Sequence, residues 1–492
     1  MNRALLRLSI ACLAMFVLLL ININYVQAFE SSSLAKEPGN IRVFNQQFQY
    51  QRGSILATGD GGATKIAESR LTAGHTGIYQ RFYPDSPVYA PVTGYDSIYG
   101  ATGIEAAENN ELSGTAPSLE VHNLVSLITG KPKLGATVAL TISPRAQQAA
   151  YQQLALSGHS GAVVAIDPRT GAILAMASFP TYDPNGYATL SGTKLNQVDA
   201  ANRANPSEPL LNRAIEQSYP PGSTFKIITS AAAFSTGKVA STNATVAAPP
   251  SLPIGNGHTL INDGGELCGD GNPPIIQAFW MSCNTAFGKL GQQLGGATLA
   301  RYATLFGANS STLKIPLPVA ASVIPAETDP AFEAFAAIGQ HNDQVTPLQE
   351  AMLAATIANH GTLEQPYLVK QVTAPDGSSV QTANPTVLSQ AVSSSVASEI
   401  ESMMVQVTQN QAGTAFATAN SSLTGGVVIA GKTGTAQNGV NNSGLNDAVF
   451  TCFAPASNPQ IAVGVIVKGG GFGAAAAAPI AVAVIKAYLK LH

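Results

Sequence analysis

The sequence contains few charged residues and few cysteines. Asp, Glu, Lys and Arg make up 11% of its 492 residues, against roughly 25% in typical soluble domains. The 25 basic and 28 acidic side chains leave a net charge of −3, so the chain lacks the positive charge that binds nucleic-acid phosphates. Four cysteines are too few for a disulfide scaffold. Because 45% of the residues are hydrophobic, the composition also excludes disorder. We therefore expect a globular protein with no nucleic-acid partner.

No motif for metal or nucleotide binding has the sequence context that its chemistry requires. The seven histidines are scattered without an H-E-x-x-H segment, so we expect neither a metal nor another cofactor. Residues 426–433 match the phosphate-binding-loop pattern, in which a flexible turn must join a strand to a helix. Here the variable positions are Val, Val, Ile and Ala, which favour a strand, and no helix pattern follows them. We therefore reject nucleotide binding at this segment.

The first residues predict export. Arg3 and Arg7 precede an apolar run over residues 8–23, which together with Leu5 and Leu6 approaches the roughly 20 residues that a membrane span needs. We expect a transmembrane anchor over residues 8–28. The arginines predict a cytoplasmic tail over residues 1–7 and an extracytoplasmic remainder behind a single-pass cell-membrane anchor. A cleaved signal peptide is the alternative, because residues 26–28 (VQA) loosely match a cleavage site. The length of the apolar segment favours the uncleaved anchor.

Residues from Ala136 onward predict an α+β fold. Strands are expected at residues 137–141, 162–166, 172–177, 427–430, 448–453 and 461–467. Helices are expected at residues 144–156, 223–234 and 348–359, and in an Ala-rich C-terminal segment with Pro479 in its first turn. Strands thus flank a central helical block, which indicates an antiparallel sheet covered by helices. Residues 29–135 indicate an extended α+β region.

One S-x-x-K segment has the local context of a nucleophile. Residues 219–222 (YPPG) predict a turn, and Ser223 then opens an amphipathic helix with Lys226 on the same face. A serine hydroxyl attacks well only when a base takes its proton. Lys226 must be neutral to act as that base, and burial beside another cation, most simply Lys432, would lower its pKa. The alternative is an ordinary serine and lysine on a surface helix.

Two further segments complete a constellation. Ser282 and Asn284 supply a hydroxyl and an amide two positions apart. The only K-T-G segment covers residues 432–434, with Thr435 after it, and it ends a strand-like run. A lysine there can attract a carboxylate, and the glycine leaves space for a substrate backbone beside the strand. Taken singly, the two segments also fit a capped turn and an edge strand.

The order S-x-x-K, S-x-N, K-T-G characterises penicillin-recognising serine enzymes. With these motifs the chain resembles a class B penicillin-binding protein of the short actinobacterial type, a membrane-anchored peptidoglycan D,D-transpeptidase. Further segments carry the resemblance: residues 51–55, 81–84, 94–95, 161–180, 212–214, 339–340 and 346–349. The resemblance implies a transpeptidase domain of the serine β-lactamase-like fold over residues 136–492. It also implies an N-terminal pedestal or interaction region over residues 29–135.

The resemblance implies catalytic roles for the matched residues. Ser223 is expected to attack the carbonyl between the two D-alanines of a peptidoglycan stem pentapeptide, and Lys226 to accept its proton. Backbone N–H groups of Ser223 and Thr435 would form the oxyanion hole. Ser282 would relay a proton to the departing D-alanine. An amine of a neighbouring stem peptide would then attack the acyl-serine, and β-lactams would leave a stable acyl-serine.

The resemblance also implies a substrate-binding set. Asn284 is expected to hold a substrate amide, and Lys432, Thr433 and Thr435 to bind the terminal carboxylate beside Gly434. A glycan polymerase of the SEDS type is an expected partner. A D,D-carboxypeptidase with water as acceptor and a non-catalytic β-lactam sensor remain the alternatives.

Cys283 inside the S-x-N segment departs from the commonest family pattern. In the oxidising exterior it could pair with Cys268 and close a small loop. Two reduced, buried thiols are the alternative.

Overall fold

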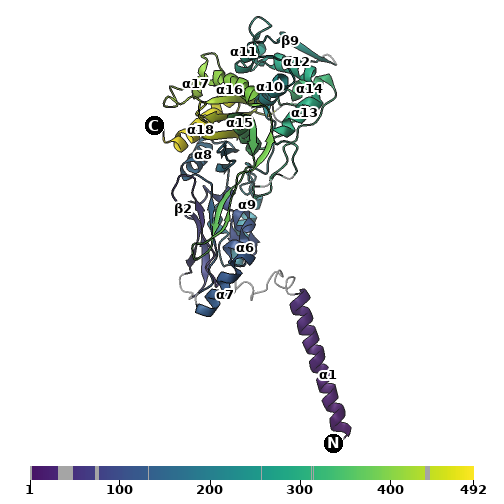
Figure 1. Ribbon diagram of the computed structural model, residues 1–492, viewed down its shortest axis with the longest axis vertical. Helices are drawn as coiled ribbons and strands as arrows, with labels where there is room; N and C mark the ends of the chain where they lie inside the picture. The colour runs from purple at the N-terminus through teal and green to yellow at the C-terminus, as the bar shows by residue number, and fades with distance from the viewer. Residues whose placement is uncertain are drawn as a thin grey trace.

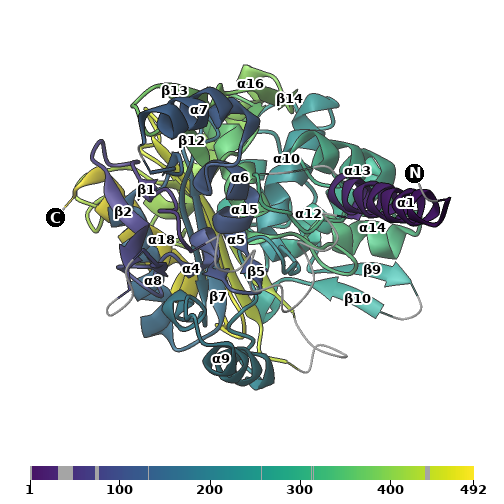
Figure 2. The ribbon, with the colours of Figure 1, turned by 90° about the horizontal axis from the view of Figure 1, so that it is seen from below.

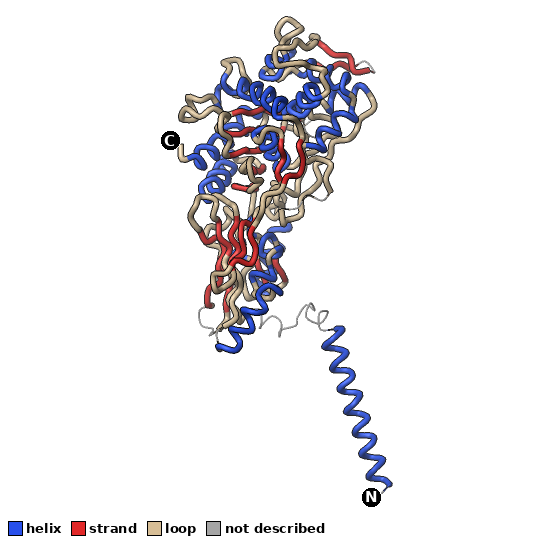
Figure 3. The backbone as a smooth tube through the Cα atoms, in the orientation of Figure 1, coloured by secondary structure: helices blue, strands red, loops and turns tan. Residues whose placement is uncertain are grey.

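The computed structural model describes residues 3–30, 48–72, 77–130, 132–255, 258–311, 313, 315–437 and 444–491. An N-terminal helix, α1 (Arg3–Tyr25), continues into the short π-helix η1 (Val26–Glu30). The remaining residues form an elongated body, with a sheet-rich N-terminal region at one end and a larger mixed region at the other (Figures 1 and 3). Among the described residues, only the α1–η1 segment is a helix both long and apolar enough to cross a membrane, which suits the expected anchor.

The larger region is built on a five-stranded antiparallel sheet with the order β15-β16-β17-β7-β8. Its strands are β7 (Gly161–Ile166), β8 (Ile173–Phe179), β15 (Ala430–Ala436), β16 (Asp447–Ala454) and β17 (Ile461–Val467). Every residue of β7, β16 and β17 is buried, because helices cover both faces. Two helices that contact each other, α8 (Pro144–Ser157) and α18 (Gly473–Leu489), pack on one face, and α15 (Pro347–Ala358) packs on the other. This architecture confirms the predicted α+β fold.

Local sequence explains where these helices begin. Ser143 caps α8 by accepting a hydrogen bond from the backbone N–H of Ala146, and Pro144 occupies the first turn. Thr346 caps α15 in the same way, with Pro347 following. Such side-chain acceptors satisfy N–H groups that have no partner within the helix. Both helices therefore start within a residue or so of the predicted positions.

A helical layer lies beside the sheet and forms much of the rest of the larger region. It contains α10 (Lys226–Ser235), α11 (Ile275–Trp280), α12 (Asn284–Leu294), α13 (Gly296–Leu305), α14 (Pro330–Ala336), α16 (Ser394–Gln409) and α17 (Phe416–Ala419). A hairpin of β9 (Ser251–Gly255) and β10 (His258–Ile261) projects at one side (Figure 2). Helix α9 (Gly192–Ala204) and the strand pair β11 (Thr362–Glu364) and β14 (Val387–Gln390) complete this region.

The N-terminal region contains a six-stranded sheet with the order β13-β12-β6-β1-β2-β3. Its strands are β1 (Ile55–Ala57), β2 (Thr64–Leu71), β3 (Tyr79–Phe82), β6 (Thr137–Leu140), β12 (Val369–Thr373) and β13 (Ser379–Thr382). Short helices α4 (Ala90–Thr93), α5 (Gly103–Ala107), α6 (Asn109–Leu112) and α7 (Glu120–Thr129) accompany it, with the small strand pair β4 (Asp96–Ser97) and β5 (Gly100–Ala101). Strands β6, β12 and β13 come from beyond residue 136, so this sheet crosses the predicted domain boundary.

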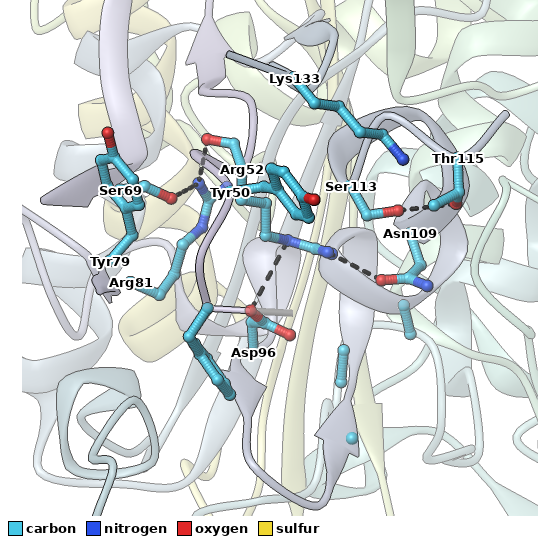
Figure 4. Close-up of a pocket in the computed structure, with 14 residues that line it drawn as sticks. Tyr50, Arg52, Ser69, Tyr79, Arg81, Asp96, Asn109, Ser113, Thr115 and Lys133 are labelled. Atoms are coloured by element: carbon cyan, nitrogen blue, oxygen red, sulfur yellow. Dashed lines mark hydrogen bonds and ion pairs between the residues drawn. The ribbon is translucent and has the colours of Figure 1, made fainter. Parts of the chain in front are cut away.

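A buried ion network lies in the N-terminal region, and Figure 4 shows three of its members, Arg52, Arg81 and Asp96. Glu105 accepts hydrogen bonds from Arg52 Nε at 2.7 Å and from Arg81 Nε at 2.5 Å, and Asp96 lies 3.8 Å from Arg52. Burial alone would raise the pKa of Glu105, but the two guanidinium groups hold it below its usual value. The network lies beside a cavity of about 590 Å³. It joins the Arg-containing segments at residues 51–55 and 81–84 that carried the family resemblance.

The structure corrects two predicted elements. The strand expected at residues 427–430 is displaced, since β15 begins at Ala430 and includes the whole K-T-G segment. The carbonyl groups of Val427 and Ile429 instead accept hydrogen bonds from the hydroxyl groups of Thr424 and Thr408. Pro479 lies inside α18 and not in its first turn, because the preceding run of alanines, the strongest helix formers, starts the helix at Gly473.

Candidate active site

A sharp turn presents Ser223 at the edge of the catalytic sheet. Gly222 has a φ of 58°, a left-handed conformation that favours glycine, and it starts the short 3-10 helix η4 (Gly222–Phe225) that leads into α10. A Cβ atom at Gly222 would lie 2.9 Å from the Thr435 carbonyl oxygen. The turn therefore packs directly against β15. Ser223 itself lines a cleft of about 510 Å³.

The same close approach explains Gly434. A Cβ atom there would lie 2.7 Å from the carbonyl oxygen of Pro221 and 2.9 Å from Cβ of Val449. We expected this glycine to leave space for a substrate backbone. The structure gives a different reason, because the missing side chain makes space for the turn that carries the nucleophile.

Ser282 lies in a short loop between α11 and α12 with a φ of 63°. Non-glycine residues rarely adopt this conformation, which costs about 1–3 kcal/mol and occurs often at functional sites. The next residue, Cys283, forms a disulfide with Cys268, with 6.1 Å between the Cα atoms. Both cysteines are buried. The predicted pairing is thus present in the structure, and it ties the Ser282 loop to the segment after β10.

Lys226 points at the S-x-N segment. Its Nζ donates to the Ser282 carbonyl oxygen at 2.7 Å and to Asn284 Oδ1 at 2.8 Å, and it lies 3.2 Å from Ser282 Oγ. Asn284 Nδ2 donates in turn to Asp263 Oδ1 at 3.2 Å, which orients the amide oxygen toward the lysine. Within the described part of the chain, Ser223 is not among the hydrogen-bond partners of Lys226.

These contacts suit a neutral amine. The Ser282 carbonyl and the Asn284 amide oxygen are pure acceptors, so they use the two hydrogens of a neutral Nζ. The lone pair can then accept the hydrogen of the Ser282 hydroxyl, whose Oγ lies 3.2 Å away. Burial, together with the positive charge of Lys432, holds the pKa of Lys226 well below its usual value. The ring centroid of Phe287 lies 5.6 Å from Lys226 Nζ, and that of Phe279 lies 5.6 Å from Lys432 Nζ, so aromatic rings supply apolar surroundings for both nitrogens.

Lys432 completes the line of polar groups. Its Nζ donates to Ser282 Oγ at 2.9 Å and to the Thr433 carbonyl oxygen at 2.9 Å. Burial lowers the pKa of Lys432 to about 7, against the opposing effect of the Asp263 carboxylate. The structure thus brings together side chains that are far apart in the sequence, with Ser282 Oγ between two lysines. Such an arrangement can pass a proton from one lysine to the other.

The cleft also contains residues that sequence analysis did not assign to the site. Asp263 and Gln340 line it with Asn284 and Thr435, and Gln340 Nε2 donates to the Thr435 carbonyl oxygen at 3.4 Å. Thr414 Oγ1 lies 2.8 Å from Thr433 Oγ1. Only the family-like segment at residues 339–340 gave any signal for Gln340. The other two come from loops without a motif, so only their tertiary contacts identify them.

A buried carboxyl group lies under the nucleophile turn. Glu350, on α15, has Oε1 2.8 Å from Thr224 Oγ1, and the same hydroxyl donates to the Pro221 carbonyl oxygen at 2.9 Å. Thr224 has one hydrogen to donate, so both contacts are satisfied only when the carboxyl is protonated and donates to the threonine. Burial raises the pKa of Glu350 to about 8. The protonated carboxyl therefore helps to hold the turn.

We expect Glu350 to make stability fall with increasing pH. Its pKa in the folded state, about 8, exceeds the reference value of 4.5, so the folded state binds the extra proton between these values. The contribution is complete below pH 4.5 and is lost as the pH rises through 8, at up to ~1.4 kcal/mol per pH unit. Glu350→Gln should remove this slope in denaturant unfolding between pH 5 and 9. The exposed Glu266→Gln should keep it, and a wild-type slope in Glu350→Gln would contradict the assignment.

Comparisons with known proteins identify the families that both regions of the chain match. Residues 161–486 match the family model of the penicillin binding protein transpeptidase domain, and residues 52–138 match the penicillin binding protein A dimerisation domain. The chain is 41% identical to the peptidoglycan D,D-transpeptidase PbpA of Mycolicibacterium smegmatis, over 100% of this chain and 99% of that protein. It is 40% identical to PbpA of Mycobacterium tuberculosis, with the same coverage.

Solved structures give the same result. The ceftriaxone acyl-enzyme complex of penicillin-binding protein A from M. tuberculosis superposes with a TM-score of 0.83 and 38% identity, over 90% of this chain and 99% of that chain. The D,D-transpeptidase domain of a peptidoglycan glycosyltransferase from Eggerthella lenta superposes with a TM-score of 0.76 and 33% identity, over 90% and 99%. Family models, full-length relatives and fold agree, and the chain belongs to the family of penicillin-binding protein transpeptidases.

Proposed function

We propose that this protein is a peptidoglycan D,D-transpeptidase in which Ser223 is the nucleophile and Lys226 its general base. The observation that carries the proposal is the convergence of Lys226, Ser282 and Lys432, with Ser282 Oγ at 3.2 Å and 2.9 Å from the two Nζ atoms. The relatives named as peptidoglycan D,D-transpeptidases, and the acyl-enzyme complex of one of them, support the same reaction class.

The first step is acylation. Ser223 Oγ attacks the carbonyl carbon between the two D-alanines of a stem pentapeptide, and its proton passes to the lone pair of Lys226 Nζ. The negative charge that develops on the carbonyl oxygen is stabilised by the backbone N–H groups of Ser223 and Thr435. The close packing of the turn on β15 supports this role, because it brings both backbones to one side of the cleft.

The tetrahedral intermediate then breaks down. The C–N bond to the terminal D-alanine breaks, and the leaving amine takes a proton through Ser282, which Lys226 and Lys432 flank. This leaves an ester between Ser223 and the stem peptide. An amine of a second stem peptide attacks the ester and loses a proton to Lys226. The bond to Ser223 Oγ then breaks, Lys226 returns the proton to that oxygen, and the new amide bond is the cross-link. A β-lactam acylates Ser223 by the same route and stays bound.

Substrate recognition follows from the walls of the cleft. Asn284, fixed by Asp263, offers its amide to the donor peptide, and Thr433 and Thr435 offer hydroxyl groups to the terminal carboxylate. Lys432 is fully buried, so we expect no direct contact between its Nζ and that carboxylate. The hydroxyl groups of Thr433 and Thr435 make the contact, and the positive charge of Lys432 attracts the carboxylate from behind them.

The N-terminal helix supports a location at the cell membrane. We place residues 1–7 in the cytoplasm, residues 8–28 in the membrane, the pedestal over residues 29–135 outside, and the transpeptidase region over residues 136–492 beyond it. This arrangement puts the cleft on the side where peptidoglycan is built. It also makes a SEDS-type glycan polymerase a reasonable membrane partner, because cross-linking needs newly made strands.

The proposal is tested by labelling the full chain with fluorescent penicillin and mapping the adduct by mass spectrometry. We expect the acyl group on Ser223 and no adduct in Ser223→Ala. Incubation with a D-Ala-D-Ala pentapeptide and a D-amino acid as acceptor then separates the possible activities. Exchange of the terminal residue supports the transpeptidase. Hydrolysis without exchange indicates a carboxypeptidase, and slow acylation without either product indicates a sensor.

A further inference from the structure

Helix α7 turns its apolar side chains outward. The following are exposed: Leu124 by 57%, Val125 by 53%, Leu127 by 79% and Ile128 by 76%. Their spacing places all of them on one broad face of the helix. A helix that packs on a protein normally buries such a face, and a contiguous exposed apolar patch usually marks an interaction site.

The opposite, polar face of α7 holds the helix to the protein. His122 Nε2 lies 2.8 Å from Asp376 Oδ2 in the turn between β12 and β13, and Asn123 Nδ2 donates to the Gly114 carbonyl oxygen at 2.8 Å. These contacts orient the helix independently of its apolar residues. The outward apolar face is therefore built into the fold and is not the result of a missing intramolecular contact.

The position of α7 relates it to the proposed anchor. In Figures 1 and 3 the helix lies at the end of the body that is remote from α12 and α14, which contribute Asn284 and Phe335 to the cleft. The chain that arrives from the anchor enters the fold beside α7: Gln51 forms a β-bridge with Leu134, and Lys133 Nζ lies over the ring of Tyr50. Residues 31–47 separate Glu30 from this entry point and can span at most roughly 60 Å.

We infer that the apolar face of α7 inserts into the interfacial layer of the membrane that holds the anchor. The inference rests on the proposed anchor, which keeps this end of the body within reach of the lipid. The face consists of aliphatic residues and lacks the Trp, Tyr and Arg side chains that dominate protein–protein hot spots. An amphipathic helix with an aliphatic face and a nearby lysine fits a lipid surface with anionic headgroups. Contact at both α1 and α7 would set the distance of the cleft from the membrane.

The inference is tested with the full chain in lipid nanodiscs of phosphatidylcholine and phosphatidylglycerol. Trp280, the single tryptophan, is replaced by Phe, and a new tryptophan is introduced by Leu127→Trp. The matched control is Leu156→Trp at the end of α8, where the leucine is 78% exposed. In nanodiscs whose lipids carry brominated acyl chains, we expect the tryptophan fluorescence of the Leu127→Trp protein to be quenched. We also expect its emission to be shifted to the blue, and we expect neither effect in the control. Adding Ile128→Asp should relieve the quenching.

Three results would overturn the inference. The first is no quenching of Leu127→Trp, and the second is equal quenching in both proteins. The third is a blue-shifted Leu127→Trp emission that occurs in native membranes but not in pure-lipid nanodiscs. The last result would indicate a protein partner. Penicillin labelling of the same samples reports on folding and on the proposed function separately. Quenching without labelling would refute the enzyme proposal while leaving the membrane contact in place.

Discussion

Replacement of Lys226 by methionine is expected to lower the rate constant of acylation by penicillin about 10²–10⁴-fold, the contribution typical of a general base. Lys226 is fully buried and its pKa is held well below the usual value, so at neutral pH it contributes a lone pair and little charge. Methionine has a similar length and no lone pair of that basicity. Methionine removes a desolvated amine, which favours folding, but it also leaves the Ser282 and Asn284 oxygens without this donor, so we expect the unfolding free energy to change by no more than about 1–3 kcal/mol.

The loss of activity in a variant that still folds separates catalysis from folding. Stopped-flow acylation gives the rate constant, and denaturant unfolding gives the stability. Lys289→Met, at a half-buried lysine of α12 that does not line the cleft, serves as the control and should acylate at the wild-type rate. The acylation rate constant of the wild type should fall on acidification, because Lys226 takes up a proton. The rate constant of Lys226→Met should show no such fall. Wild-type acylation by Lys226→Met would rule out the assigned base.

Removal of the Cys268–Cys283 disulfide is expected to lower the unfolding free energy by about 3 kcal/mol. The cysteines are 15 residues apart, and closing a loop of that length stabilises a protein by about this amount. We expect acylation to slow as well, because the bond holds the loop in which Ser282 adopts its unfavourable positive φ. A looser loop moves Ser282 Oγ away from the two lysines.

The measurement compares Cys268→Ala/Cys283→Ala with the wild type, with and without a thiol reductant. Alanine is used because both sites are buried and a serine hydroxyl there would need a partner. Reductant should lower the stability of the wild type toward that of the double variant and leave the double variant unchanged. Cys12→Ser, in the exposed N-terminal helix, should behave like the wild type. A wild type that is insensitive to reductant after full reduction would contradict the prediction.

Particular elements explain what sequence reasoning could predict. The edges of β16 and β17 were found within one residue, because uninterrupted apolar runs are typical of strands that are buried on both faces. The strand at β15 was misplaced, because its residues (AGKTGTA) have little intrinsic preference for a strand. That segment becomes a strand because it pairs with β16 from Ala430↔Phe453 to Ala436↔Asp447. Its position is a tertiary property.

The active site likewise contains residues that the sequence could predict and contacts that it could not. Ser223 and Lys226 could be paired from their spacing, and the motif order identified Ser282 and Lys432. The contact of Lys226 with Asn284 instead of Ser223, and the packing of Gly434 against Pro221, could not be predicted. Asp263, Thr414 and Glu350 carry no local signal, because each contributes through a contact with a distant segment.

The amino-acid sequence by itself determined which chemical groups this protein has for acyl transfer, because a hydroxyl, an amine and an amide at fixed short spacings are local properties of the chain. The tertiary structure alone decided how those groups act. Packing removes water from Lys226 and Lys432, places their positive charges against each other, and so sets which amine is free to accept a proton. Desolvation and charge proximity depend on segments far apart in the chain, and no pattern of neighbouring residues contains them.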